Sequence, residues 1–139
     1  RLLGRFATFG QRRAMALRLN AALDGGFTIP PESDATVEHV LPRNVHEDSH
    51  WMVTWPDPAK RREQCDTLGN FVLLTNKVNQ KADRLDYRAK KEVYFNGGGG
   101  ADFALTRDLM DQDAWTPEVV RKRTERLAEI LAEEWNLLA

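Results

Sequence analysis

Two short apolar segments constrain the fold of this chain more than any other feature. Residues 35–40 and 69–74 are the candidate strands, and Pro42 stops the first of them. Thr75 directly follows the second and can cap a helix that starts there. A strand, a long connection, a strand and then a helix predict a two-stranded hairpin packed on that helix. We expect this core to span about residues 35–82.

Helices are predicted on both sides of the core. In residues 11–23, Ala14, Leu17 and Ala21 recur at helical spacing, and two glycines follow. Thr116-Pro117 is a strong helix start, with threonine as N-cap and proline at the first helical position. Shorter helices are predicted over 85–95 and 103–110, with a flexible connection over 96–100. The predicted fold class is α+β and mostly helical, with N- and C-terminal helices wrapped around the hairpin.

The length and composition fit one ordinary domain. A chain of 139 residues is the size of a single domain, taken here as 1–139. Its apolar runs are only a few residues long, so we expect no membrane span, and no secretory signal is visible. Cys65 is the only cysteine, which excludes an internal disulfide and favours a reducing, cytoplasmic location. Because it begins at an arginine and not at a methionine, we expect the chain to be part of a larger protein.

The charge is unevenly distributed although the net charge is only −1. Five arginines and no acidic residue lie within residues 1–23, and six cations against two acids lie within 77–91. Local basic faces of this kind can bind phosphate while the total stays near zero. Lys81, Arg84 and Arg88 are therefore candidate phosphate contacts, and a solvated helix surface is an equally good interpretation.

Four polar residues suit phosphodiester hydrolysis. Glu38 and His39 lie where the first strand ends, Asn70 lies at the second, and Asn79 lies on the following helix. Histidine, with an ordinary pKa of about 6.5, can accept a proton from water near neutrality. Its other ring nitrogen needs an acceptor, which the Asn70 amide or a nearby backbone carbonyl could supply. A carboxylate and an amide oxygen suit Mg²⁺ or Mn²⁺, which stabilises the leaving oxygen.

These residues carry a resemblance to a known family. Glu38-His39-x-x-Pro42 followed by Asn70 and Asn79 resembles the HNH (ββα-metal) nuclease pattern, with asparagine in place of its final histidine. The wider frame resembles the C-terminal nuclease domain of GmrSD-type modification-dependent restriction enzymes. The Ssp phosphorothioate-sensing defence nucleases are similar in architecture. The frame consists of Trp51, Trp55, Leu68–Leu74, Asn76–Lys81, Lys91–Tyr94, Trp115-Thr116, Arg123–Leu127 and Trp135.

The resemblance implies a ββα-metal core and a metal-dependent DNA endonuclease or nickase that acts in bacterial antiphage restriction. It implies that His39 is the general base, that Glu38 and Asn79 are metal ligands, and that Asn70 orients the histidine. It also implies an N-terminal ParB-like nucleotide-hydrolysing domain that recognises the DNA. The substrate would be double-stranded DNA, and cutting both strands would need a dimer or two separate events.

Two alternatives stay open at this point. The chain could be a non-catalytic DNA-binding or docking module that keeps the ββα-metal fold, since its net charge is near zero and glutamate replaces the commoner aspartate before His39. It could also be a zinc-organised interaction domain built on His46, His50 and Cys65.

The nuclease hypothesis depends on whether Glu38 and His39 can reach the same site. Adjacent strand residues point to opposite faces, so Glu38 and His39 share a site only where the strand ends or twists.

The tryptophans have a structural interpretation. Trp51 and Trp55 lie in the long polar connection between the strands, where aromatic side chains could stack on DNA bases. We expect them instead to anchor this connection to the core. Trp115 and Trp135 are expected to be core residues.

Overall fold

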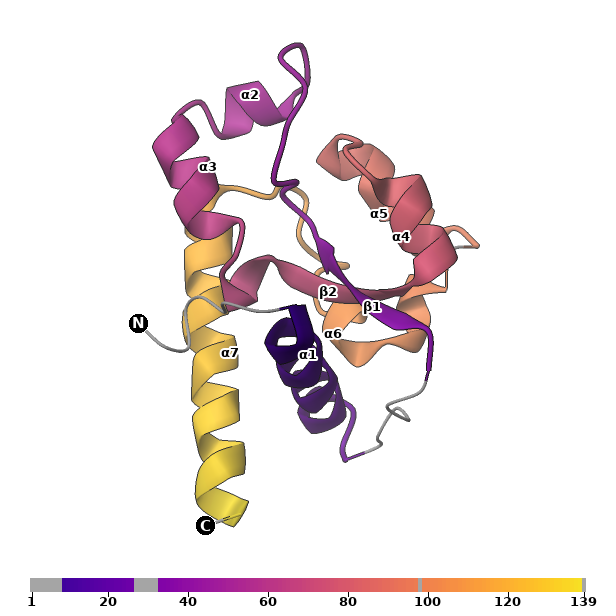
Figure 1. Cartoon of the computed structure of the whole chain (residues 1–139), viewed down its shortest axis with the longest axis vertical. Coiled ribbons are helices and arrows are strands. Elements are labelled where there is room, and N and C mark those ends of the chain that lie inside the picture. The colour runs from indigo at the N-terminus through magenta and orange to yellow at the C-terminus, as the bar shows by residue number, and fades with distance from the viewer. Residues whose placement is uncertain (1–8, 27–32, 98, 139) are drawn as a thin grey trace.

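The computed structural model describes residues 9–26, 33–97 and 99–138. A two-stranded antiparallel hairpin lies at the centre, with helices packed around it (Figure 1). The elements in chain order are α1 (Phe9–Leu23), β1 (Ala35–His39), α2 (Trp51–Thr54), α3 (Pro58–Gln64), the 3₁₀ turn η1 (Leu68–Asn70), β2 (Phe71–Thr75), α4 (Asn76–Ala82), α5 (Tyr87–Phe95), the 3₁₀ turn η2 (Gly100–Asp102), α6 (Ala104–Arg107) and α7 (Pro117–Leu138). The predicted class, mostly helical α+β around a hairpin, is confirmed. None of the described helices is both long and apolar enough to cross a membrane.

The hairpin confirms the two predicted strands and shifts three of their boundaries: β1 ends at His39 and β2 spans Phe71–Thr75. β1 pairs with β2 from Ala35 opposite Thr75 to His39 opposite Phe71. The second strand begins two residues later than predicted, because Gly69 and Asn70 lie in the 3₁₀ turn η1. Helix α7 holds this turn close: the Gly69 N–H donates to Thr124 Oγ1 at 2.9 Å, and Arg123 donates to the Gly69 carbonyl at 2.8 Å. Side chains of α7 therefore hold Gly69, while the Asn70 carbonyl still accepts from the Val40 N–H at 3.0 Å.

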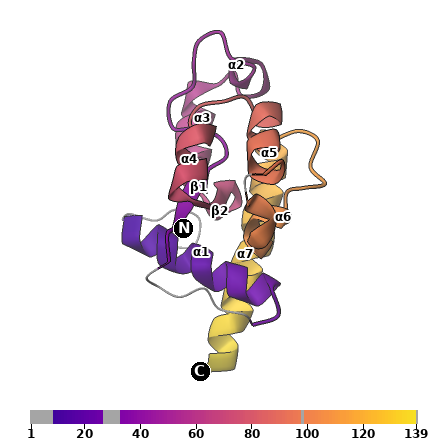
Figure 2. The same cartoon turned by 90° about the vertical axis from the view of Figure 1, so that its right-hand side faces the viewer.

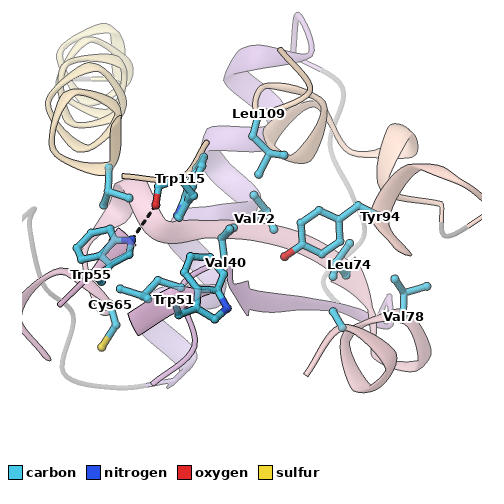
Figure 3. Close-up of a cluster of buried hydrophobic side chains, with 13 residues drawn as sticks. Val40, Trp51, Trp55, Cys65, Val72, Leu74, Val78, Tyr94, Leu109 and Trp115 are labelled. Carbon is cyan, nitrogen blue, oxygen red and sulfur yellow. Dashed lines mark hydrogen bonds between the residues drawn. The ribbon is translucent and has the colours of Figure 1, made fainter. Parts of the chain in front are cut away.

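The two faces of the hairpin build two hydrophobic cores. Val72 and Leu74 of β2 enter one core, which includes Val40, Trp55 and Tyr94 and is drawn in Figure 3. The alternate residues Phe71 and Leu73 enter the other core, together with residues of α1 and α7. Since neighbouring strand residues face opposite cores, Glu38, opposite Val72, and His39, opposite Phe71, lie on opposite faces of the sheet.

The long connection between the strands is anchored by its tryptophans, as expected. Trp51 and Trp55 are 2% and 1% exposed, so neither ring is available to stack on a base. The Trp51 indole donates to the Leu85 carbonyl at 2.9 Å, and the Trp55 indole donates to the Trp115 carbonyl at 2.7 Å (Figure 3). Trp115 is also buried. The fourth tryptophan, Trp135, has a side chain that lies outside the described part of the chain.

The predicted helix starts are confirmed by their caps. Thr75 Oγ1 accepts from the Val78 N–H at 3.4 Å at the start of α4, and Thr116 Oγ1 accepts from the Val119 N–H at 3.2 Å at the start of α7. The predicted spacing in α1 is less accurate. Ala14 is exposed, whereas the buried residues of this helix are Ala16, Leu19 and Asn20. Because alanines lie on more than one side of α1, its apolar residues do not define a single face. Packing against α6 and α7 decides which side of the helix is buried.

Candidate active site

A pocket of about 610 Å³ lies between β1, the residues that follow it, and helix α4. Helix α4 lies beside β1 in both views of the molecule (Figures 1 and 2). β1 contributes Thr36, Val37, Glu38 and His39 to the pocket lining, and the loop after it contributes Pro42, Arg43 and Asn44. Helix α4 and the turn after it contribute Asn76, Asn79, Gln80, Asp83 and Arg84. Three of the four predicted site residues, Glu38, His39 and Asn79, therefore line one pocket although two of them leave β1 on opposite faces.

The carboxylate of Glu38 is held from behind by helix α5. Lys90 Nζ donates to Glu38 Oε2 at 2.9 Å, and Tyr94 Oη donates to the same oxygen at 2.6 Å. Within the described residues, the other oxygen, Oε1, makes no hydrogen bond, and Glu38 lines the pocket. Burial raises the pKa of Glu38, against the opposing effects of Lys90 and Tyr94. The arrangement fixes one carboxylate oxygen and leaves the other as an acceptor.

The amide of Asn79 is oriented by its hydrogen bonds to β1. Its Nδ2 donates to Thr36 Oγ1 at 2.9 Å and to the Val37 carbonyl at 3.0 Å. The Thr36 hydroxyl donates its own proton to the Leu74 carbonyl at 3.0 Å, so both groups facing the amide are acceptors. Only the NH₂ side of the amide can satisfy them. The carbonyl oxygen Oδ1 must therefore face the other way, and Asn79 lines the pocket.

The donor set fits a hard divalent cation. One carboxylate oxygen of Glu38 and one amide oxygen of Asn79 belong to the same pocket, and Mg²⁺ commonly takes one or two protein oxygens together with waters and substrate phosphates. The described residues contain no group of three or more His, Cys, Asp or Glu side chains that could hold a metal ion. His46, His50 and Cys65 therefore do not form the zinc site of the alternative hypothesis.

The imidazole of His39 has a carboxylate partner. His39 Nε2 lies 3.0 Å from Asp66 Oδ1, and the ring also packs edge-on against Phe71, with ring centroids 5.1 Å apart. Burial lowers the pKa of His39, and the bond to Asp66 opposes that shift. The pKa of Asp66 is lowered: burial is the largest single effect and acts to raise it, but the hydrogen bond with His39 and the nearby charges, Arg43 first, together outweigh burial. A neutral imidazole beside an ionised carboxylate follows.

The side chain of Asn70 bonds elsewhere than to the histidine ring. It is fully buried and closes the long connection between the strands: Oδ1 accepts from the Leu41 N–H at 2.8 Å and from the Trp115 indole at 3.0 Å. Its Nδ2 donates to the Leu41 and Cys65 carbonyls, both at 2.9 Å. Asn70 thus holds the backbone just after His39, and Asp66 occupies the acceptor position that the sequence assigned to Asn70 or its neighbourhood.

The candidate phosphate contacts lie in different places. Arg84 lines the pocket, whereas Arg88 lines a second hollow of about 470 Å³ beside Trp51 and Tyr87. Lys81 is exposed on α4 and is not among the described residues that line either of the two hollows. Arg43 lines the pocket as well, and the sequence patterns did not select it.

Sequence reasoning missed Asp66, Lys90 and Tyr94. Lys90 and Tyr94 are four residues apart, which places them on one face of α5, and both are fully buried. A lysine on the buried face of a predicted helix is the signal that could have found this pair, because lysine is rarely buried without a charged partner. Asp66 carries no such local signal.

The chain also matches a family of known proteins. Residues 6–130 match the family model described as "GmrSD restriction endonucleases, C-terminal domain". Among the curated proteins and the solved structures, none matches the chain.

Proposed function

Because the chain belongs to the family of C-terminal domains of GmrSD restriction endonucleases, we propose that it is a metal-dependent endonuclease domain of the HNH type that nicks or cleaves duplex DNA. The observation that carries this proposal is the shared pocket of His39, Glu38 and Asn79. A base, a carboxylate oxygen and an amide oxygen around one pocket are the groups that hydrolysis of a phosphodiester needs.

In this mechanism His39 acts as the general base. Its neutral ring accepts a proton from the water that attacks the phosphorus, while Nε2 of the ring lies 3.0 Å from Asp66 Oδ1. Glu38 and Asn79 would hold Mg²⁺ or Mn²⁺, which supplies charge stabilisation for the leaving oxygen when bound. Lys90 and Tyr94 keep the Glu38 carboxylate in place.

Arginines at the pocket are suited to binding the DNA backbone. Arg43 and Arg84 line the pocket and can donate to phosphate oxygens on either side of the cleaved bond. With few phosphate contacts, DNA affinity should be weak, and its logarithm should fall by about 0.9 per neutralised phosphate for each tenfold rise in salt. We propose that a ParB-like nucleotide-hydrolysing domain of the same cytoplasmic protein selects the target, in defence against phage.

The test is relaxation of supercoiled plasmid by the protein in the presence of Mg²⁺ or of EDTA. We expect nicking only with the metal, and a loss of roughly 10²- to 10⁴-fold for His39→Ala, which removes the general base. His46→Ala is the matched control, because this exposed histidine lies outside the lining of the pocket. A folded His39→Ala protein that nicks as fast as the control would contradict the proposal and favour a docking module.

A further inference from the structure

Asp66 lies in the loop before η1, 27 residues after His39 in the sequence. One oxygen of its carboxylate, Oδ1, lies 3.0 Å from His39 Nε2 and 3.0 Å from Arg43 Nη2, and Arg12 Nη2 lies 3.7 Å away. We propose that Asp66 is a positioning residue that keeps the proton of His39 on Nε2 and so makes Nδ1 the nitrogen that receives the proton from water. This inference rests on the proposed function.

The tautomer follows from the chemistry of the partner. An ionised carboxylate can only accept a hydrogen bond, so the ring nitrogen that faces it must carry the proton. In a neutral imidazole the second nitrogen is then unprotonated. Within the described residues, Nδ1 has no hydrogen-bond partner, and His39 lines the pocket. Nδ1 therefore has its lone pair available to a water molecule.

Asp66 is kept ionised by its surroundings. The Arg43 guanidinium donates to the oxygen that faces His39, and Arg12 of α1 lies 3.7 Å from that oxygen. The Asp66 side chain is 17% exposed, which limits screening of these charges by water. A protonated Asp66 could donate to Nε2 and so select the other tautomer. By keeping Asp66 ionised, the two arginines keep it the acceptor and Nε2 the donor.

Two contacts together define the position of the ring. The bond to Asp66 fixes one ring nitrogen, and the edge-on contact with Phe71 fixes the ring plane, with an interplanar angle of 78°. Arg43 connects the same carboxylate to the pocket lining. One carboxylate oxygen of Asp66 thereby contacts both the base, His39, and Arg43, the proposed phosphate-binding cation. Such a shared contact helps to align the attacking water with the phosphate.

The tautomer can be measured without any DNA. With His46→Gln and His50→Gln, His39 is the single histidine of the chain, and ¹⁵N-histidine labelling gives one pair of ring nitrogen signals. We expect a single neutral Nε2–H tautomer whose N–H proton is slow to exchange. Asp66→Ala should give a mixture of tautomers and lose the protected proton, and Glu63→Gln, an exposed acid on α3, should change neither.

Kinetics separate positioning from binding. We expect Asp66→Ala to lower kcat for plasmid nicking by about 10- to 100-fold with KM little changed. Arg43→Gln should mainly raise KM, and because Arg12 remains 3.7 Å from the Asp66 carboxylate, the Nε2–H signature should persist. If the protein nicks DNA but His39 is the Nδ1–H tautomer, the role of Asp66 is overturned and the proposed function stands. The same holds if Asp66→Ala matches Glu63→Gln in both the tautomer and the kinetic measurement. A wild-type protein that does not nick DNA would instead overturn the proposed function.

Discussion

The Lys90 ammonium lies 2.9 Å from Glu38 Oε2 in the interior, where the two side chains are 0% and 5% exposed. This ion pair connects α5 to the end of β1, and Lys90 also donates to the His39 carbonyl at 2.9 Å. Burial raises the pKa of Glu38 and lowers that of Lys90, while each charge opposes the shift of the other. The pair therefore depends on both partners being present.

Removing one partner should be more harmful than removing both. Lys90→Met leaves the Glu38 carboxylate buried without its cation, and we expect the free energy of unfolding to fall by about 3–5 kcal/mol. Combining Lys90→Met with Glu38→Gln removes the orphan charge and should recover part of that loss. Urea unfolding of the two proteins measures the difference. A double variant less stable than Lys90→Met alone would contradict the ion-pair interpretation.

Metal affinity should depend on Glu38 and Asn79. We expect Glu38→Gln and Asn79→Ala each to weaken Mn²⁺ binding at least about tenfold, because the first replaces an anionic oxygen ligand with a neutral amide and the second removes an amide oxygen. Isothermal titration with MnCl₂ in the absence of DNA measures this directly. Asn76→Ala is the control, since Asn76 lines the same pocket on the same helix. Equal Mn²⁺ affinity in the wild type and the three variants would mean that the metal does not bind to Glu38 and Asn79.

The stability of the protein should fall on mild acidification because of His39. Its pKa is lowered by burial, so below its ordinary value of about 6.5 the unfolded chain binds a proton more readily than the folded one. The free energy of unfolding that the neutral His39 contributes above pH 6.5 is therefore lost as the pH falls from 6.5 towards the pKa of His39 in the folded protein. His39→Gln should lose less stability than wild type between pH 7 and pH 5, which chemical unfolding at the two pH values checks. Parallel losses in the two proteins would argue against a buried, neutral His39.

Gly69 should tolerate no side chain. A Cβ at this position would meet the Val120 carbonyl and Thr124 Oγ1 of α7, and would lie 2.7 Å from the Thr124 nitrogen. Because backbone atoms cannot yield easily, we expect Gly69→Ala to lower the free energy of unfolding by about 1–3 kcal/mol. Gly10→Ala is the matched control, since a Cβ there has no neighbour within 4 Å. Thermal unfolding of the two variants compares them.

The hairpin and its following helix could be predicted because their signals are local. The β-branched strand residues, the stop at Pro42 and the cap at Thr75 each act within a few residues, and the structure keeps all three. Asn79 could also be placed beside β1, since α4 begins directly after β2 and must pack back on the hairpin.

The partners of the site residues could not be predicted, because they come from distant parts of the chain. Lys90 lies 52 residues from Glu38, and Asp66 lies 27 residues from His39. Asn70 was assigned to the histidine, yet its hydrogen-bonding capacity is used to close the connection at Leu41 and Cys65. The conformation of the long connection between the strands decides which acceptor reaches the His39 ring. The sequence of this connection has little periodicity, so that conformation could not be predicted.

The most direct test of a metal-dependent active site is anomalous diffraction from crystals grown with Mn²⁺. We predict a peak in the pocket beside His39, with Glu38 Oε1 and Asn79 Oδ1 both at ligand distance, roughly 2.0–2.2 Å. A peak away from both oxygens, or a pocket without a peak at saturating Mn²⁺, would contradict the proposed metal-dependent nuclease.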